Sequence, residues 1–506
     1  MKNLVSGKTL ALTLCSTGFL FPGLHTAEAK KAKGKNAKPN VIYLYFDDLG
    51  YGELGCYGQT KIKTPNIDKL ADEGIRFTQH YTTFPVSAPA RCGLMTGKHS
   101  GHSFIRGNYE MGGFADEEEG GQMALPEGCM TIADLMKQAG YTTGGIGKWG
   151  MGMPNTSGNP NWQGFDYFYG YMDQKQSHNF YPTHLWENGQ WVPLNNEFFF
   201  VHGNKLPADA SKEAFDAFIG KDYSIDRMAE KTLEFIRENK DKPFFLYLPY
   251  TTPHISLQCI EEAVKEYIGQ FDEKPYLGNQ GYAPCMYPYS TYAAMITYTD
   301  KQIGRIMALL KELGLDENTI FMVSSDNGVT FDAGGINGEY FNSTAGLRGR
   351  KQDLYEGGIS IPFIARWPGK IPAGKETGLI SAQYDLFATL TELTGQKPAW
   401  KTDGISFLPT LLGKPEKQQK HDYLYFEFPE KSGQVAVIKG QMKGVKSNMK
   451  EGPGTWEVFD LSVDRNETTD LSAEHPELIT EFEDIIKKEH WQAEIREWEF
   501  IDPKFK

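Results

Sequence analysis

Four short runs of aliphatic, β-branched and aromatic residues mark the chain at 40–46, 243–249, 319–324 and 361–365. None of them alternates regularly between apolar and polar positions, which is typical of strands buried on both faces of a parallel sheet. Segments with apolar residues at helical spacing lie between them. One, at 66–77, follows Thr64-Pro65, a cap residue and a proline suited to the first helical position. The other helical segments cover 130–139, 229–239 and 292–313.

Strands that alternate with helices predict an α/β fold, with a large mixed, mostly parallel sheet between two layers of helices. After about Gly413 the pattern changes to short strands in succession, followed by a helix at 476–488. This part is predicted to be a small antiparallel sheet with one helix. We therefore expect a catalytic α/β domain over 40–413 and a C-terminal α+β subdomain over 414–506. The predicted C-terminal strands lie within 421–428, 434–440, 441–446 and 455–462.

Composition narrows the class of protein. The chain has 506 residues, of which 13% are aromatic and 23% charged, so most of it can form a large core and is not disordered. Its formal net charge of −13 argues against nucleic acid as the main partner, because phosphate binding needs a basic face. A few cations in a cleft can still hold an anionic substrate. The six cysteines are scattered without CxxC spacing, which excludes a disulfide scaffold.

The first residues have the pattern of a secretory signal over 1–29. A basic start precedes an apolar run at 10–21, and 27–29 reads Ala-Glu-Ala, a small-x-small cleavage site. A basic tether over 30–39 follows. We expect export across the inner membrane to the periplasm, with no membrane span, because no later stretch approaches ~20 apolar residues. Cys15 follows a bulky leucine, which disfavours lipoprotein anchoring.

Two of the predicted strands end in oxygen ligands. Asp47-Asp48 follows the first strand, and Asp326-Asn327 follows the run at 319–324. In open α/β sheets, ligands bind beyond the carboxyl ends of strands. Three carboxylates and an amide, without His or Cys, favour a hard cation, Ca²⁺ before Mg²⁺. Each pair taken singly also suits a turn.

Residues 87–97, SAPARCGLMTG, resemble the signature of the formylglycine-dependent type I sulfatases, [C/S]-x-P-x-R followed by x-x-L-x-T-G. This resemblance implies an alkaline-phosphatase-like fold and hydrolysis of a sulfate ester, and it extends over nearly all of the chain after the leader. It also covers DDLGYG at 47–52, TPNIDKLADEGIRF at 64–77, GKWG at 147–150, TTPH at 251–254, SSDNG at 324–328, LRGRK at 347–351 with EGG at 356–358, and EVFDLSVDRNE at 457–467.

The resemblance implies that Ser87 is oxidised to formylglycine, whose hydrated form supplies the nucleophilic oxygen. A plain serine would keep the sulfate as a stable ester, whereas a gem-diol can expel it. Serine rather than cysteine at this position implies a serine-type maturation enzyme. The remaining implied roles are a calcium ion on Asp47, Asp48, Asp326, Asn327 and the modified Ser87, nucleophile stabilisation by Arg91, sulfate binding by Lys148 and Lys351, and protonation of the leaving sugar oxygen by His254.

The chain departs from the family pattern at Gly150, where many members have a histidine proposed as a base. His99, His102 or His178, or lysine and solvent, are the candidates to replace it. For the substrate we expect a sulfated glycan of the galactose or N-acetylgalactosamine type. His178 is predicted to contact a sugar hydroxyl, and His102, Arg106 and Asn108, which follow the signature, are predicted to line the same cleft.

Two other functions remain open at this point. One is a phosphomonoesterase or phosphodiesterase of the same superfamily, although those enzymes commonly have Asp-His where this chain has Asp326-Asn327. Asn is a poor substitute for imidazole on zinc. The other is a non-catalytic glycan-binding homologue, which predicts loss of Ser87, Arg91 or a metal carboxylate. All of these residues are present.

Overall fold

The computed structural model describes residues 38–502, which belong to one compact unit. The expected signal peptide at 1–29 and most of the expected tether at 30–39 lie outside the described residues. Among the helices that are described, none is long and apolar enough to cross a membrane. The five cysteines of this part of the chain are all free thiols.

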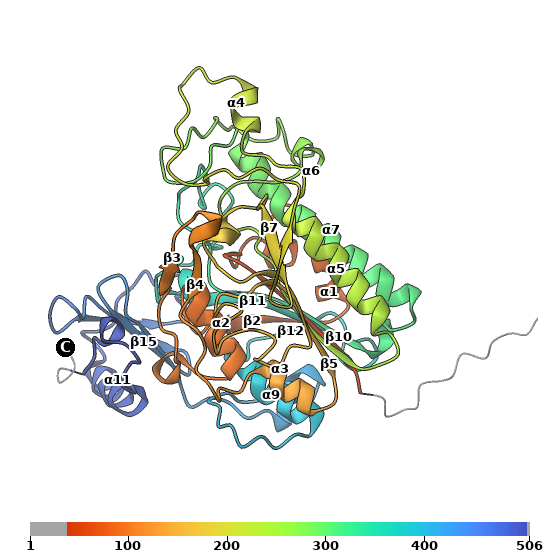
Figure 1. Ribbon diagram of the computed structural model, residues 1–506. Helices are drawn as coiled ribbons and strands as arrows, with labels where there is room; N and C mark the ends of the chain where they lie inside the picture. Colours follow the sequence, from red (N-terminus) through yellow and green to blue (C-terminus); the bar gives the residue numbers. More distant parts are fainter. Residues whose placement is uncertain (1–37, 503–506) are drawn as a thin grey trace, which may run out of the picture. The chain divides into compact units, whose positions relative to one another are not determined.

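An eleven-stranded sheet organises the unit (Figure 1), in the order β12-β2-β11-β10-β1-β9-β5-β6-β7-β8 with β13 beside β2. The strands β10, β1, β9, β5 and β6 are parallel to one another. In contrast, β11 is antiparallel to both β10 and β2. The predicted mixed, mostly parallel sheet is confirmed. Its strands are β1 (Asn40–Phe46), β2 (Ile75–Tyr81), β5 (Thr142–Lys148), β6 (Tyr167–Tyr171), β7 (His184–Glu187), β8 (Gln190–Pro193), β9 (Phe244–Pro249), β10 (Thr319–Ser325), β11 (Ser360–Arg366), β12 (Lys375–Thr377) and β13 (Ser381–Ala382).

Helices cover both faces of this sheet (Figure 1), which explains why β1 carries apolar side chains at successive positions. Ile42 and Leu44 pack with α1, α5 and α7 on one face. Val41 and Tyr43 pack with α2, α3 and α9 on the other. The helices are α1 (Pro65–Asp72), α2 (Ser87–Thr96), α3 (Ile132–Gln138), α4 (Lys212–Asp216), α5 (Ser224–Glu238), α6 (Glu261–Lys265), α7 (Pro288–Glu312), α8 (Glu356–Ile359), α9 (Asp385–Thr394) and α10 (Leu408–Leu411).

The helix expected over 66–77 is shorter than predicted, because α1 ends at Asp72 and Ile75 already belongs to β2. The reason is tertiary. Ile75 pairs with Ala365 of β11, and Gly74 lies so close to the Ala365 carbonyl that any side chain there would collide with it. Strand pairing therefore overrides the helical spacing of this segment.

A second, four-stranded antiparallel sheet follows in the order β14-β15-β16-β17. One face packs against α11 through Phe482 and Ile486. The other contributes Phe426 to a core that includes Ala90 of α2, so this sheet supports the helix that begins at Ser87. The elements are β14 (Leu424–Phe428), β15 (Gln434–Lys439), β16 (Met442–Ser447), β17 (Thr455–Asp460) and α11 (Pro476–Glu489), and β3 (Glu110–Gly112) and β4 (Glu119–Gln122) form a separate hairpin.

Candidate active site

Three parallel strands of the large sheet bring polar residues together where they end. Asp47 and Asp48 follow β1, Asp326 and Asn327 follow β10, and Lys148 is the last residue of β5. Because β10, β1, β9 and β5 are neighbours with the same direction, their carboxyl ends lie along one edge of the sheet. All five side chains are buried there.

Ser87 joins this group from the first turn of α2. Its Oγ donates to Asp47 Oδ1 over 3.0 Å, while Lys148 Nζ lies 2.6 Å from Asp47 Oδ2. One carboxylate therefore links the serine hydroxyl to a buried ammonium. The serine is 1% exposed, so its oxygen is shielded from bulk water in this arrangement.

Asp48 has a left-handed backbone, with φ of 64°, an uncommon conformation for a residue with a side chain. Its Oδ1 accepts from Asn327 Nδ2 over 2.8 Å, and its Oδ2 lies 2.8 Å from Lys351 Nζ and 3.7 Å from His254 Nε2. Backbone strain of this kind is concentrated at functional sites, where the surrounding contacts maintain it.

Arg91 lies one helical turn after Ser87 and contacts the ends of both β1 and β10. Its Nη2 lies 2.9 Å from Asp326 Oδ2 and 3.7 Å from Asp47 Oδ2. Its Nη1 donates to the Lys148 carbonyl over 3.0 Å. Three buried cations, Arg91, Lys148 and Lys351, thus face three buried carboxylates.

This arrangement of charges shifts the pKa values of Asp47 and Asp326 in opposite directions. Burial alone raises the pKa of Asp47, but Lys148, His254 and Arg91 overcome it and hold this pKa well below its usual range. For Asp326, burial and then the charge of Asp47 raise the pKa to about 7. The protein's own cations therefore do not fully compensate the third carboxylate.

The donor set fits a hard cation. Asn327 Oδ1 is buried and has no hydrogen-bond partner among residues 38–502, and oxygens of Asp47 and Asp48 lie within 4.8 Å of each other and of a His254 ring nitrogen. Oxygen-rich sites of this kind suit Ca²⁺ or Mg²⁺. Asp47, Asp48, Asp326 and Asn327 are the residues that would hold the ion.

His254 lies beside these carboxylates, in the segment after β9. Its Nδ1 hydrogen-bonds to the Ile255 carbonyl, so Nδ1 carries the proton and Nε2 faces Asp48. Burial, and then Lys351, lower the pKa of His254 to about 4. The His178 ring stacks on it, with centroids 4.6 Å apart.

His202 completes this group, although nothing in the sequence pattern singled it out. Its Nδ1 lies 2.6 Å from the Gly281 carbonyl, which makes Nδ1 the donor. Its Nε2 then accepts from His178 Nδ1 over 3.0 Å. These bonds leave His178 Nε2 as an acceptor suited to a hydroxyl group. His202 comes from the loop after β8, and only the tertiary fold brings it to His254.

Gly150, the position at which the chain departs from the family pattern, is a glycine for a structural reason. Its φ is +73°, and a Cβ there would lie 2.8 Å from Gln174 Cγ. Gln174 Nε2 is buried without a partner among the described residues. The space next to Gly150 is therefore occupied by an amide donor in place of an imidazole.

The structure places the three residues after the signature differently from one another. Asn108 accepts from the backbone N–H of Ala88 over 3.0 Å, directly beside Ser87. Arg106, however, is buried in an ion pair with Glu427. Its guanidinium therefore joins the loop after α2 to β14 of the C-terminal sheet and does not lie in the cluster around Ser87.

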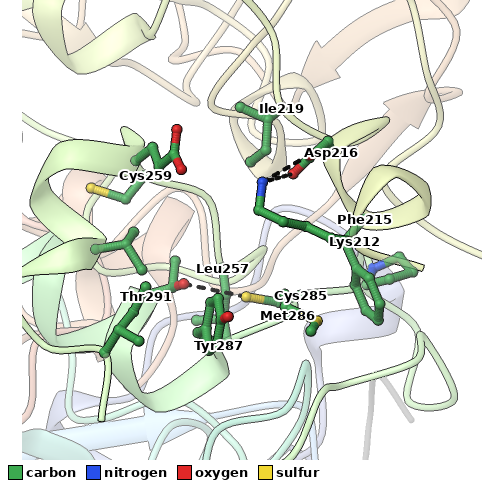
Figure 2. A pocket seen from close by; sticks show the side chains of 14 residues that line it. Lys212, Phe215, Asp216, Ile219, Leu257, Cys259, Cys285, Met286, Tyr287 and Thr291 are labelled. Carbon is green, nitrogen blue, oxygen red and sulfur yellow. Dashed lines mark hydrogen bonds and ion pairs between the residues drawn. The ribbon is translucent and has the colours of Figure 1, made fainter. Parts of the chain in front are cut away.

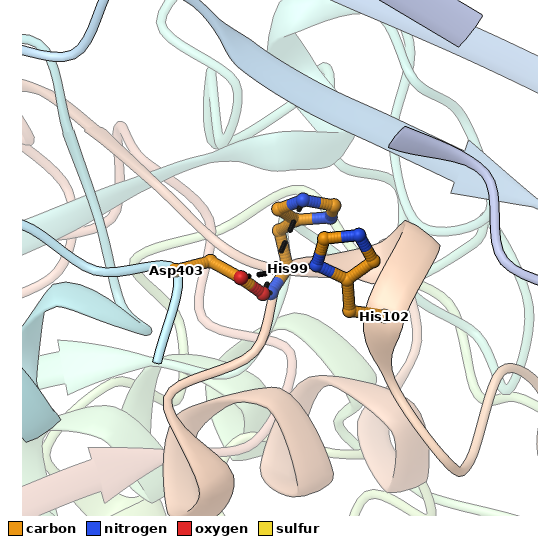
Figure 3. Close-up of side chains that lie close together, drawn as sticks. All are labelled: His99, His102 and Asp403. Carbon is orange, nitrogen blue, oxygen red and sulfur yellow. Dashed lines mark hydrogen bonds and ion pairs between the residues drawn. The ribbon is translucent and has the colours of Figure 1, made fainter. Parts of the chain in front are cut away.

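His102 also lies outside that cluster. It forms a separate group with His99 and Asp403 (Figure 3), in which its Nδ1 lies 3.0 Å from Asp403 Oδ1. The two imidazole rings are 4.0 Å apart. Neither ring has a described contact with Ser87, so the geometry does not favour His99 or His102 as the missing base.

A large apolar cavity of about 400 Å³ lies elsewhere, between α4, α6 and α7 (Figure 2). Leu257, Val264 and Met286 are among its lining residues, as are the thiols Cys259 and Cys285. None of the strand-end residues described above lines it. The polar cluster around Ser87 is therefore the candidate active site.

Comparison with known proteins identifies the class. Residues 39–396 match the family described as Sulfatase, and residues 350–500 match the C-terminal part of N-sulphoglucosamine sulphohydrolase. The chain belongs to the sulfatase family, has its alkaline-phosphatase-like fold, and is a sulfuric ester hydrolase.

Individual relatives are similar over most of their length. The N-acetylgalactosamine-6-O-sulfatase of Bacteroides thetaiotaomicron is 30% identical, over 91% of this chain and 95% of its own. The N-acetylgalactosamine-6-sulfatase of Canis lupus familiaris is 28% identical, over 90% and 80%. Among solved structures, Ps i-CgsB in complex with k-i-k-neocarrahexaose has a TM-score of 0.71 and 26% identity, over 90% of this chain and 94% of its own.

Proposed function

We propose that this enzyme hydrolyses a sulfate monoester on a carbohydrate, and that Ser87, after oxidation to formylglycine, supplies the nucleophilic oxygen. The observation that carries the proposal is the position of Ser87. Its Oγ is hydrogen-bonded to Asp47, which is also paired with Lys148. A nucleophile at a helix start beside buried cations is placed to react with an anionic ester.

Asp47, Asp48, Asp326 and Asn327 would hold a calcium ion. When bound, the ion polarises sulfate oxygens and lowers the pKa of the attacking hydroxyl. Arg91 holds Asp326 at 2.9 Å and so keeps one ligand in place while its charge also favours the ionised nucleophile. The unpartnered Asn327 oxygen and the poorly compensated Asp326 both support this site.

Lys148 and Lys351 would bind the non-bridging oxygens of the sulfate group. Each now pairs with a carboxylate, Asp47 or Asp48, at 2.6 and 2.8 Å. Both lysines are buried, so their attraction for a second anion is only weakly screened. Preorganised cations of this kind stabilise the charge that develops on the sulfate during hydrolysis.

His254 would protonate the departing sugar oxygen. Its pKa of about 4 in the free chain reflects burial and Lys351. A sulfate ester bound between the lysines adds negative charge next to the ring, which raises the pKa and favours the protonated acid. His178, stacked on His254, would accept a hydrogen bond from a sugar hydroxyl through Nε2. Asn108, which is bonded to the Ala88 backbone next to Ser87, would contact the substrate there.

The substrate we propose is a sulfated galactose or N-acetylgalactosamine glycan. Relatives named for N-acetylgalactosamine 6-sulfate support this class, as does a structural neighbour in complex with neocarrahexaose. We further propose export to the periplasm, maturation of Ser87 by a serine-type enzyme, and a division near residue 413 between a catalytic domain and a C-terminal subdomain.

The experiment is release of free sulfate from a panel of galactose, N-acetylgalactosamine and N-acetylglucosamine sulfated at positions 2, 3, 4 or 6. The chain is co-expressed with a serine-type maturase, and intact mass reports oxidation of Ser87. Ser87→Ala is the blank, and sugar phosphates are the control. Release that disappears in the blank supports the proposal. Hydrolysis of the phosphates alone, or turnover by Ser87→Ala, would contradict it.

A further inference from the structure

A cleft lies beyond the C-terminal end of α2, the helix that begins at Ser87. Helix α2 begins at Ser87 and ends at Thr96, which places Lys98 about 15 Å from the nucleophile along the helix axis. The cleft has a volume of about 280 Å³, just below the ~300–1,000 Å³ of typical small-ligand sites. Lys98, Trp400 and Trp491 line it.

Lys98 is a buried cation that forms no direct ion pair, although its charge helps to lower the pKa of the nearby Asp403. The residue is only 8% exposed, and among residues 38–502 no hydrogen bond or ion pair reaches its Nζ. The ammonium lies 5.7 Å from the ring centroid of Trp400 and 5.7 Å from that of Trp491. Burying a charge is costly unless an opposite charge compensates it.

Among the residues that line the cleft, cations outnumber carboxylates. Lys401 adds a second cation, and Glu494 is the acidic residue of the lining. Asp403 lies behind the lining and is hydrogen-bonded to His102. Arg106 also borders it, but Glu427 already neutralises that guanidinium. The cleft therefore favours an anion, in a protein whose net charge is −13.

Both tryptophans are held in place by the chain around the end of α2. Trp400 Nε1 donates to the Thr96 carbonyl over 2.8 Å, and the Trp491 backbone N–H donates to Gly101 over 3.1 Å. The His102 ring packs on the Trp491 ring at 4.0 Å, and Asp403 fixes that imidazole (Figure 3). This explains the histidine cluster as the support of an aromatic wall. Trp491 nevertheless stays 55% exposed.

We propose that this cleft binds one anionic sugar ring, sulfated or carboxylated, at a distance from the catalytic site. The ring would lie against Trp400 and Trp491, because indole offers an apolar face to sugar C–H groups. Its anionic group would pair with Lys98. The inference rests on the proposed function for its ligand class, since a polymeric sulfated glycan would offer further rings to such a site and so bind with higher avidity.

The test uses the full chain as Ser87→Ala, labelled with 5-fluorotryptophan, so that ¹⁹F signals report each indole without turnover. Trp400→Phe and Trp491→Phe assign the two signals. The probes are N-acetylgalactosamine 6-sulfate, glucuronate, neutral N-acetylgalactosamine and sodium sulfate. We expect the sulfated sugar, the uronate or both to shift the two signals. The Kd from these shifts should be at least about tenfold lower than for the neutral sugar or for sulfate alone. The separate sulfated and carboxylated probes identify which anion the cleft prefers.

Lys98→Met should remove these shifts, because it keeps the side-chain stem but not the charge. Lys69→Met, at an exposed lysine of α1, is the matched control, and the signal of Trp191, 45% exposed on β8, should not move. Unmoved Trp400 and Trp491 signals, equal binding of neutral sugar or plain sulfate, or undiminished shifts in Lys98→Met would each overturn the proposal.

The site is separable from catalysis. Trp491→Ala in the matured, active chain should keep kcat/KM on a sulfated monosaccharide within about twofold. Hydrolysis without ¹⁹F shifts would refute this cleft and leave the proposed function intact. Shifts in a matured chain that hydrolyses no sulfate ester would refute the proposed function and leave the cleft.

Discussion

The side-chain nitrogen of Asn327 donates to Asp48 Oδ1 over 2.8 Å, and the side-chain oxygen of Asn327 is buried without a partner among the described residues. The hydrogen bond to Asp48 sets the orientation of the amide, so the position offers oxygen rather than nitrogen to a ligand. That distinguishes this strand end from a zinc site with histidine at the same position, and favours calcium and sulfate chemistry over the phosphatase alternative.

Removal of the cation should therefore destabilise the site. Chelation is expected to lower the thermal midpoint and abolish sulfate release, and Ca²⁺ should restore both. At a hundredfold excess over Kd, binding contributes about 2.7 kcal/mol. Asp48→Asn should weaken the calcium-dependent shift in scanning fluorimetry, whereas Asp216→Asn, at an exposed carboxylate of α4, should not. An equal calcium response in both variants would contradict the assignment.

Loss of His254 should depend on the leaving group. His254→Ala is expected to lower kcat/KM on sugar sulfates by about 10²–10⁴-fold, the usual contribution of a general acid. Activated aryl sulfates, whose leaving groups need little protonation, should lose far less. The measurement is a pair of steady-state assays, with His475→Ala at an exposed position as the control. Equal losses on both substrates would remove His254 from the acid role.

Arg106 should matter for stability and not for the substrate. Arg106→Met removes the arginine partner of buried Glu427 and leaves His490 and Tyr425 on that carboxylate. The expected cost is about 3 kcal/mol of unfolding free energy in urea titration, the lower end of the range for a broken buried pair. Lys487→Met breaks an exposed pair with Asp484 and should cost far less. In folded Arg106→Met, KM on a sulfated monosaccharide should stay within about twofold. A large rise in this KM without destabilisation would show that Arg106 contributes to substrate binding at the catalytic site.

Acid should destabilise the fold through His80. Burial lowers the pKa of His80 to about 3, below the ~6.5 of an exposed histidine. As pH falls from 6.5 towards 3, the unfolded chain takes up a proton that the folded chain refuses, so stability present above pH 6.5 is lost. Between pH 7 and 5 this amounts to about 2 kcal/mol.

The neutral variant His80→Gln should have a smaller loss over the same pH range. Its ring contacts with Phe363 are lost at every pH, so only the slope of unfolding free energy against pH reports the titration. Parallel slopes for the two proteins would show that His80 does not carry the effect.

Much of the site follows from local sequence. A run such as 40–46 has no polar alternation because helices cover both faces of its strand, and a sheet buried in this way exposes its chemistry at the strand ends. Asp47 and Asp326 could therefore be paired in advance, and the pattern at 87–97 pointed to Ser87 as the proposed nucleophile through a family resemblance.

Other features depend on contacts between distant segments, and these contacts leave no local signal in the sequence. Helix α1 ends at Asp72 because Ile75 pairs with β11. The antiparallel direction of β11 leaves no periodic signal in the sequence. His202 reaches His178 across a loop, whereas Arg106, next to the signature in sequence, is drawn away by Glu427. Local pattern specifies which side chains a strand presents and where it ends. Which distant side chains meet there depends on long-range packing and charge pairing, which no single segment encodes.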